Sequence, residues 1–95
     1  TMNPAVVDVT TLRHREQVIE VTLGETSPLA GKTLTEVGEG DLLGEGLFII
    51  AVERDGEPFF PRPDTAFTAG DELLVFSRGT ITADDAALFT GREPG

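Results

Sequence analysis

The stretch Phe48-Ile-Ile-Ala-Val-Glu-Arg-Asp-Gly-Glu-Pro-Phe-Phe-Pro61 limits the fold of this chain more than any other. An Asp-Gly pair between two apolar runs favours a two-residue turn of type I′, because both turn residues need positive φ. We therefore predict a hairpin with strands at about 47–54 and 57–61, in which Val52 lies opposite Phe59. Both faces would be apolar. Phe48, Ile50, Val52 and Phe59 would share one face, and Leu47, Ile49, Ala51 and Phe60 the other. A small sheet usually keeps one face in water, so the second face needs a cover.

Composition limits the partners of the chain. It has 95 residues, which suits one domain with a modest core. Its net charge is -10, from 17 acidic and 7 basic residues, and Lys32 is the single lysine. Because binding to nucleic acid depends on basic residues, we expect no nucleic-acid partner. We also expect no direct membrane insertion, because no apolar run reaches about 18 residues. The surplus of acids indicates adaptation to high salt or, more simply, solubility.

The remaining elements follow from periodicity and capping signals. We expect a half-buried strand at 17–23, a short helix after Thr33, the hairpin, a strand at 72–77 and a last helix from Thr82 to Gly91. Each helix start has a capping box, Thr33 with Glu36 and Thr82 with Asp85. Residues 5–12 suit either a short helix or an extended linker. The order β-α-β-β-β-α predicts an α+β fold with a small, largely antiparallel sheet and short helices.

No set of residues indicates catalysis. The chain has no cysteine, its one histidine (His14) stands between two arginines, and neither serine has a histidine at a recognisable spacing. We therefore expect no enzyme. Asp41 and Glu45, in the Gly-rich loop 38–46, are candidate oxygen ligands for a divalent cation, with a solvated loop as the simpler alternative. Arg62, between two prolines, could receive an anion, and Arg54 is expected to form a surface pair with Glu57.

Five stretches in order resemble the TrkA-C, or RCK_C, domain family. They are Ile19-Glu-Val-Thr-Leu23, Ser27-Pro-Leu-Ala-Gly-Lys-Thr-Leu34, Ile49-Ile-Ala-Val-Glu-Arg-Asp-Gly56, Pro63-Asp-Thr65 and Ala69-Gly-Asp-Glu-Leu-Leu-Val75. Their order and gaps agree over residues 17–80. On this resemblance we expect residues 1–16 to be a connector from a preceding domain, residues 17–90 to be the TrkA-C domain and residues 91–95 to be a tail.

The resemblance implies a regulatory module on the cytosolic face of potassium channels and uptake systems. Such modules often follow a Rossmann-type RCK_N domain, act on a membrane pore or transporter subunit, and dimerise. Some bind cyclic di-AMP or cations near the dimer interface. Carried over, the ligand positions are Leu47, Phe48, Arg62 and Pro63. Asp41 and Glu45 nearby would repel phosphate, so a divalent cation, or no ligand, is favoured over cyclic di-AMP. The alternative is a ligand-free dimerisation module of another ion transporter or antiporter.

A homodimer also answers the question that the hairpin raises. An apolar face of a few hundred Å² is seldom left in water on a monomer. A second copy related by a two-fold axis would cover this face with the same face. We therefore predict a dimer interface containing Phe48, Ile50, Val52 and Phe59, with Phe48 and Ile50 as the favoured contacts.

Overall fold

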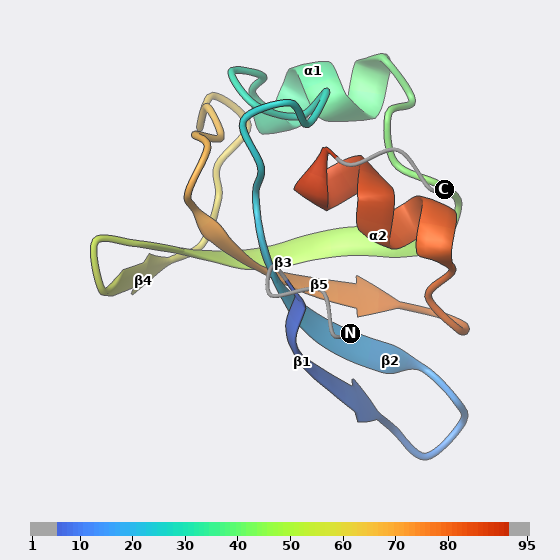
Figure 1. Cartoon of the computed structure of the whole chain (residues 1–95). Coiled ribbons are helices and arrows are strands. Elements are labelled where there is room, and N and C mark those ends of the chain that lie inside the picture. The colour runs from blue at the N-terminus through green and yellow to red at the C-terminus, as the bar shows by residue number, and fades with distance from the viewer. Residues whose placement is uncertain (1–5, 92–95) are drawn as a thin grey trace.

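The computed structural model describes residues 6–91, with side chains from Val9 onward. The elements are β1 (Val6–Thr11), β2 (Gln17–Thr22), α1 (Leu34–Glu39), β3 (Leu47–Arg54), β4 (Glu57–Phe59), β5 (Glu72–Ser77) and α2 (Ala83–Thr90). The five strands form one antiparallel sheet in the order β1-β2-β5-β3-β4, and both helices lie on the same side of it (Figure 1). The α+β fold predicted from the sequence is confirmed.

Residues 6–11, for which the sequence suited a helix or a linker, form the edge strand β1. It pairs with β2 so that Val9 lies opposite Ile19. The role of residues 1–16 as a connector stays a prediction. Residues 1–5 of that connector, and residues 92–95 of the tail, lie outside the described residues.

Both predicted capping boxes are present. The Thr33 hydroxyl oxygen accepts a hydrogen bond from the Glu36 N–H at 3.1 Å, and Glu36 Oε1 accepts one from the Thr33 N–H at 2.9 Å. This backbone hydrogen bond is the main reason that the pKa of Glu36 is lowered. Thr82 and Asp85 make the same pair of bonds, and α2 ends at Gly91, where φ is 77°. Neither helix, and no other segment of residues 6–91, is a helix long and apolar enough to cross a membrane.

The hairpin has the predicted turn and register. Asp55 and Gly56 have φ of 53° and 80°, as a type I′ turn requires, and Val52 lies opposite Phe59. Strand β4 ends at Phe59, two residues before the expected end. The shorter strand has a local reason, because Pro61 has no N–H to donate to the ladder.

The predicted division of the hairpin into two faces is wrong because β3 contains a β-bulge. Ile49 pairs with Val75, but Ala51 pairs with the preceding residue, Leu74. An extra residue reverses the alternation of side chains along a strand. Val52 therefore lies in the core, 1% exposed, and Phe59 opposite it packs against the core.

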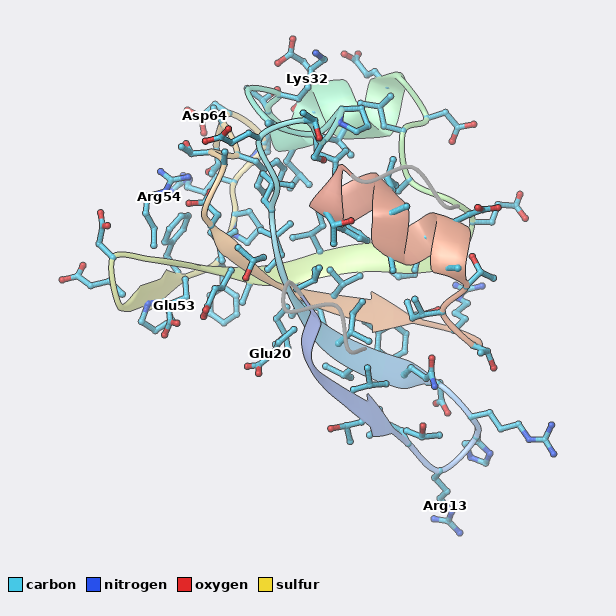
Figure 2. All side chains as sticks on the ribbon, in the orientation of Figure 1. Arg13, Glu20, Lys32, Glu53, Arg54 and Asp64 are labelled. Atoms are coloured by element: carbon cyan, nitrogen blue, oxygen red, sulfur yellow. The ribbon has the colours of Figure 1, made fainter. Side chains whose placement is uncertain are left out.

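Phe48, ahead of the bulge, and Ile50, the unpaired residue within it, are exposed, whereas Leu47 is buried and Ile49 packs against the core. Beyond the bulge, Ala51 and Glu53 alternate with the buried Val52. Figure 2 shows Glu20 and Glu53 pointing away from both helices. The sheet therefore has one covered and one helix-free side.

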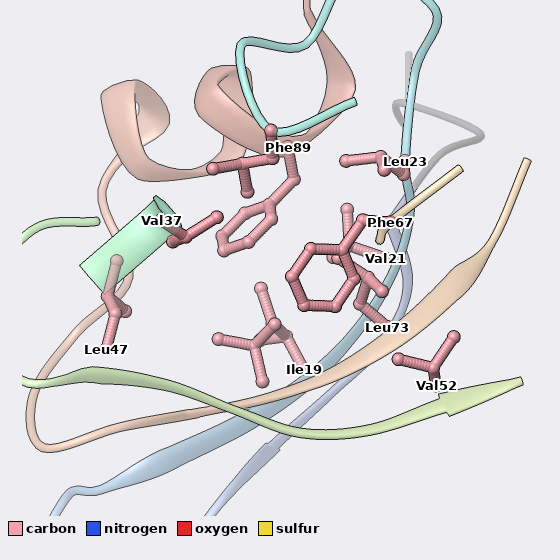
Figure 3. Packing of buried hydrophobic residues seen from close by; sticks show 11 residues of the cluster. Ile19, Val21, Leu23, Val37, Leu47, Val52, Phe67, Leu73 and Phe89 are labelled. Carbon is pink, nitrogen blue, oxygen red and sulfur yellow. The ribbon is translucent and has the colours of Figure 1, made fainter. Parts of the chain in front are cut away.

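The core fills the space between the helices and the covered side of the sheet (Figure 3). Phe89 from α2 and Phe67 from the segment before β5 are fully buried there. The core residues are Ile19, Val21, Leu23, Leu29, Val37, Leu47, Val52, Phe67, Leu73, Val75 and Phe89. Because the helices cover only this side, no helix or strand of residues 6–91 packs on the other side of the sheet.

Candidate functional site

The helix-free side of the sheet is the first candidate site, and we call it the outer face. Along β2, β3 and β5 its side chains alternate with buried ones, except at the bulge in β3, where this alternation is interrupted. The residues of the outer face are Val18, Glu20, Phe48, Ile50, Ala51, Glu53, Glu72, Leu74 and Phe76. β2, β5 and β3 lie side by side and present these side chains together.

An apolar strip crosses the middle of the outer face. Phe76 lies between Val18 on β2 and Phe48 on β3. The Phe48 and Phe76 rings pack with centroids 6.3 Å apart and planes inclined by 43°. Phe48 is 48% exposed and Ile50 36% exposed, so the strip is open to water. The Arg78 guanidinium covers one part of it, 5.7 Å from the centre of the Phe48 ring.

Three carboxylates occupy one end of the outer face. Glu53 lies directly opposite Glu72, and Glu20 lies on the neighbouring strand β2. All three line a pocket of about 150 Å³ with Pro58 and Leu74. A side-chain hydrogen bond with Glu53, followed by burial and by the charges of Glu53 and Glu20, raises the pKa of Glu72. Like charges directly opposite on adjacent strands repel each other, so a positively charged group bound at this end would be stabilising.

A groove of about 390 Å³ adjoins the outer face at Phe48. It is lined by Leu34, Val37, Gly38, Asp41, Leu43, Gly44, Glu45, Leu47, Phe48 and Ile49, which come from α1, the following loop and the start of β3. The structure thus brings the candidate ligand positions Leu47 and Phe48 together with the candidate metal ligands Asp41 and Glu45. No group of three or more acidic or histidine side chains within the described part of the chain could hold a metal ion.

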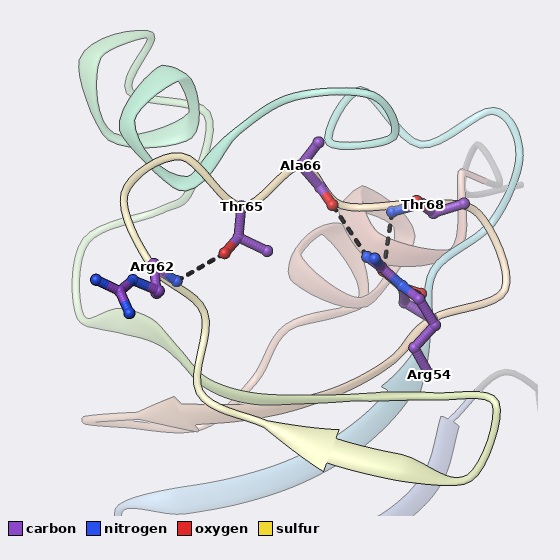
Figure 4. Close-up of polar contacts among 6 residues, drawn as sticks. Arg54, Arg62, Thr65, Ala66 and Thr68 are labelled. Atoms are coloured by element: carbon purple, nitrogen blue, oxygen red, sulfur yellow. Dashed lines mark hydrogen bonds and ion pairs between the residues drawn. The ribbon is translucent and has the colours of Figure 1, made fainter.

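The other two candidate ligand positions lie elsewhere. Arg62 and Pro63 belong to the loop after β4 and are not among the residues that line the groove. The Arg62 N–H donates to Thr65 Oγ1 at 2.8 Å, and the Arg62 side chain points away from the loop (Figure 4). The Pro63 carbonyl oxygen accepts from the N–H and the hydroxyl of Thr35 on α1, at 3.1 and 2.9 Å. Within one copy, Arg62 therefore does not line the groove in which a ligand would bind.

Arg54 does not form the predicted surface pair with Glu57. Its Nε and Nη2 donate to Oδ1 and Oδ2 of Asp71 at 2.8 and 2.7 Å, and Nη2 also donates to the Ala66 carbonyl at 3.0 Å (Figure 4). Asp71 is 2% exposed and also accepts from the Thr68 N–H at 2.9 Å. Burial alone would raise the pKa of Asp71, but these hydrogen bonds and the charge of Arg54 lower it overall. The pair is structural, because it ties β3 to the segment before β5.

The sequence did not reveal that Val18 and Phe76 belong to the outer face, or that Arg78 borders it. A signal for Phe76 was present, because residues 72–77 are apolar on both faces, as in the hairpin. Val18 and Arg78 join the site only through the strand order, in which β5 lies between β2 and β3. That order is not encoded in any local pattern.

The fold and this site define a small α+β domain with helices on one sheet face and an exposed apolar strip on the other. Residues 18–87 match the TrkA-C domain family, and the chain belongs to that family. Trk system potassium uptake protein TrkA homolog 1 from Methanosarcina mazei is 31% identical over 90 residues, which are 94% of this chain. The chain spans 19% of the length of that relative. The resemblance seen in the sequence is confirmed.

Proposed function

We propose that this chain is a cytosolic regulatory domain of a potassium uptake system, which senses a ligand and dimerises. Membership of the TrkA-C family, together with 31% identity to a Trk system potassium uptake protein, carries the proposal. As the resemblance implies, its partners are a Rossmann-type RCK_N domain and a membrane pore or transporter subunit. The direct test is potassium uptake by cells that express the full-length protein with an intact or an altered outer face.

The proposed dimer forms through the outer face, which differs from the interface predicted from the sequence. Val52 and Phe59 are withdrawn from that interface because they belong to the covered side. Phe48 and Ile50 remain, and Phe76 joins them through its packing with Phe48. A strip of this kind, bordered by charged residues, is typical of a protein–protein contact.

Phe48→Asp is expected to weaken the homodimer by at least about 2 kcal/mol, or roughly 30-fold in Kd, because it buries a carboxylate where a ring was. Sedimentation equilibrium measures this change. Val9→Asp is the matched control. Val9 is also 48% exposed, but it lies opposite Ile19, on the covered side of the sheet. Equal weakening by the two variants, or a wild-type chain that stays monomeric at high concentration, would contradict the proposed interface.

The ligand is proposed to bind in the groove beside Phe48, where a second copy at the outer face would lie close by. Asp41 and Glu45 line this groove, and a dimer would supply two such pairs. Carboxylates favour a divalent cation over a phosphate. A ligand can gate the parent protein only if it binds one state better than the other, and a site at a dimer interface meets that condition.

Ca²⁺ or Mg²⁺ is expected to raise the melting temperature of the dimer, and Asp41→Asn with Glu45→Gln is expected to remove that response. A ligand present at 100 times its Kd adds about 2.7 kcal/mol. Cyclic di-AMP is the competing ligand. If cyclic di-AMP raises the melting temperature and Arg62→Ala removes that shift, cyclic di-AMP and not a divalent cation is the favoured ligand. No shift with either ligand would favour the alternative, a ligand-free dimerisation module of another ion transporter or antiporter.

The proposed role is regulatory and not catalytic. The hydroxyl groups of the two serines are used in the fold, since Ser27 donates to the Leu88 carbonyl and Ser77 to the Gly79 carbonyl. His14 is exposed in the turn between β1 and β2, where its backbone N–H donates to Glu16. None of these side chains faces the groove.

A further inference from the structure

The charges on the outer face are separated along its strands. Glu53 and Glu72 lie at one end, where β5 begins, and Arg78 follows the last residue of β5 at the other end. The two ends are about 20 Å apart along the strand. The turn that carries Arg13 lies at the same end as Arg78, because Gln17 at the start of β2 pairs with Ser77. Figure 2 shows Arg13 far from Glu53.

Neither end is neutralised by the side chains that the structure describes. Glu53 and Glu72 lie opposite each other, and Glu20 adds a third negative charge. Arg78 is exposed, contacts the Phe48 ring and has no ion-pair partner among the side chains that the structure describes. The apolar strip lies between these ends. The outer face therefore has an acidic end, an apolar middle and an end marked by Arg78, which we call the basic end and which also adjoins Asp41 and Glu45 of the groove.

A two-fold axis between two such faces has two limiting directions, along the strands and across them. If the axis runs along the strands, the strands of the two copies are parallel, and the acidic end of one copy meets the acidic end of the other. Stacked sheets are about 10 Å apart, so several carboxylates would then crowd together out of water. If the axis lies across the strands, β5 of one copy lies over β5 of the other, and the two strands run in opposite directions. The acidic end then meets the basic end twice.

We propose that two copies of this chain pack outer face to outer face with their β5 strands antiparallel, so that Arg78 of each copy meets Glu53 and Glu72 of the other. The inference rests on the proposed homodimer and adds its orientation. The midpoint between Glu72 and Arg78 falls beside Leu74 and Phe76, so the apolar strip packs on itself at the axis. Two partly buried ion pairs then fix the orientation, and the apolar strip supplies the affinity.

Charge reversal with rescue tests the orientation. Arg78→Glu alone and Glu72→Arg alone are each expected to raise the dimer Kd about tenfold or more, because each change creates two like-charge contacts. An equimolar mixture of the two variants is expected to form heterodimers with near-wild-type Kd, since both contacts are then opposite in charge. The double variant is expected to regain the wild-type Kd as a homodimer. Sedimentation and native mass spectrometry measure these equilibria, after circular dichroism has shown that each variant is folded.

Each alternative gives a different result. With parallel strands, Glu72→Arg would relieve repulsion and tighten the dimer, which overturns the proposed orientation. Glu39→Arg makes the same charge change on α1, on the covered side, and is expected to leave the Kd unchanged. A wild-type dimer that forms only with added Mg²⁺ or Ca²⁺ would mean that Glu53 and Glu72 bind a metal ion and not Arg78 of the other copy, which overturns the proposed contact. If Phe48→Asp separates the copies but charge reversal has no effect, the orientation is wrong and the interface stands. A monomeric wild type would overturn both.

Discussion

Replacing Asp71 with asparagine is expected to lower the free energy of unfolding by about 3 kcal/mol, measured by denaturant titration at neutral pH. Asp71 Oδ1 accepts from Arg54, and Oδ2 accepts from both Arg54 and the Thr68 N–H. An asparagine must point its amide NH₂ group at one of these donors, whichever way it is turned. The substitution also leaves Arg54 without its ion pair.

Asp64→Asn is the matched control for this substitution. Asp64 is an exposed carboxylate in the loop after β4, and its change is expected to stay within about 0.5 kcal/mol of the wild type. Arg54→Lys keeps the positive charge but loses the two-pronged contact, so an intermediate loss is expected. If Asp71→Asn proves no more destabilising than Asp64→Asn, the ion pair does not hold β3 to the segment before β5.

The same pair gives the stability of the domain a dependence on pH. Because the folded state lowers the pKa of Asp71, the carboxylate contributes stability above its unfolded pKa. That contribution is lost as the pH falls through the folded pKa. The stability difference between the wild type and Asp71→Asn is therefore expected to shrink as the pH is lowered from neutral to about 3. A difference that stays constant with pH would assign the effect to packing instead of ionisation.

The parts of the fold that the sequence predicted depend on neighbouring residues. The turn at Asp55 and Gly56 follows from their tolerance of positive φ, and the helix starts follow from side chains three residues apart. The parts that it missed depend on residues far apart. Arg54 pairs with Asp71 and not with Glu57, which is nearer in sequence and opposite in register, because the Asp71 carboxylate is buried and needs a partner, whereas Glu57 is exposed to water.

The candidate site was predicted in part for the same reason. Phe48 and Ile50 were placed on one face correctly, because the alternation of side chains changes only after Ile50. Val52 follows the bulge, and nothing in the run Ile49-Ile50-Ala51 marks its position. The groove joins Phe48 to Asp41 and Glu45 through a short loop, whereas Pro63 is hydrogen-bonded to Thr35 of α1, and neither Pro63 nor Arg62 lines the groove. Apart from Val52 and the pairing of Arg54 with Glu57, residues close in sequence were grouped correctly, and those joined only by the topology were not.

Gly24→Ala is expected to be among the most damaging single substitutions in the chain, at about 3 kcal/mol. A Cβ at this position would overlap the backbone carbonyl oxygen of Thr90 at the end of α2. The Gly24 N–H also donates to the Phe89 carbonyl at 2.9 Å, and Ser27 donates to Leu88. The turn after β2 is thus held directly against the last turn of α2, with backbone on both sides and no flexible side chain to move aside.

Gly38→Ala makes the identical chemical change with the opposite expected sign. Gly38 lies within α1, has no heavy atom near the position of a Cβ, and does not have positive φ. Alanine there should raise the free energy of unfolding by about 0.5–1 kcal/mol, because glycine is a poor helix residue. If Gly24→Ala unfolds at the same denaturant concentration as the wild type, α2 can shift at little cost. Since Phe89 fills the core from α2, such a result would mean that the core does not fix the position of that helix.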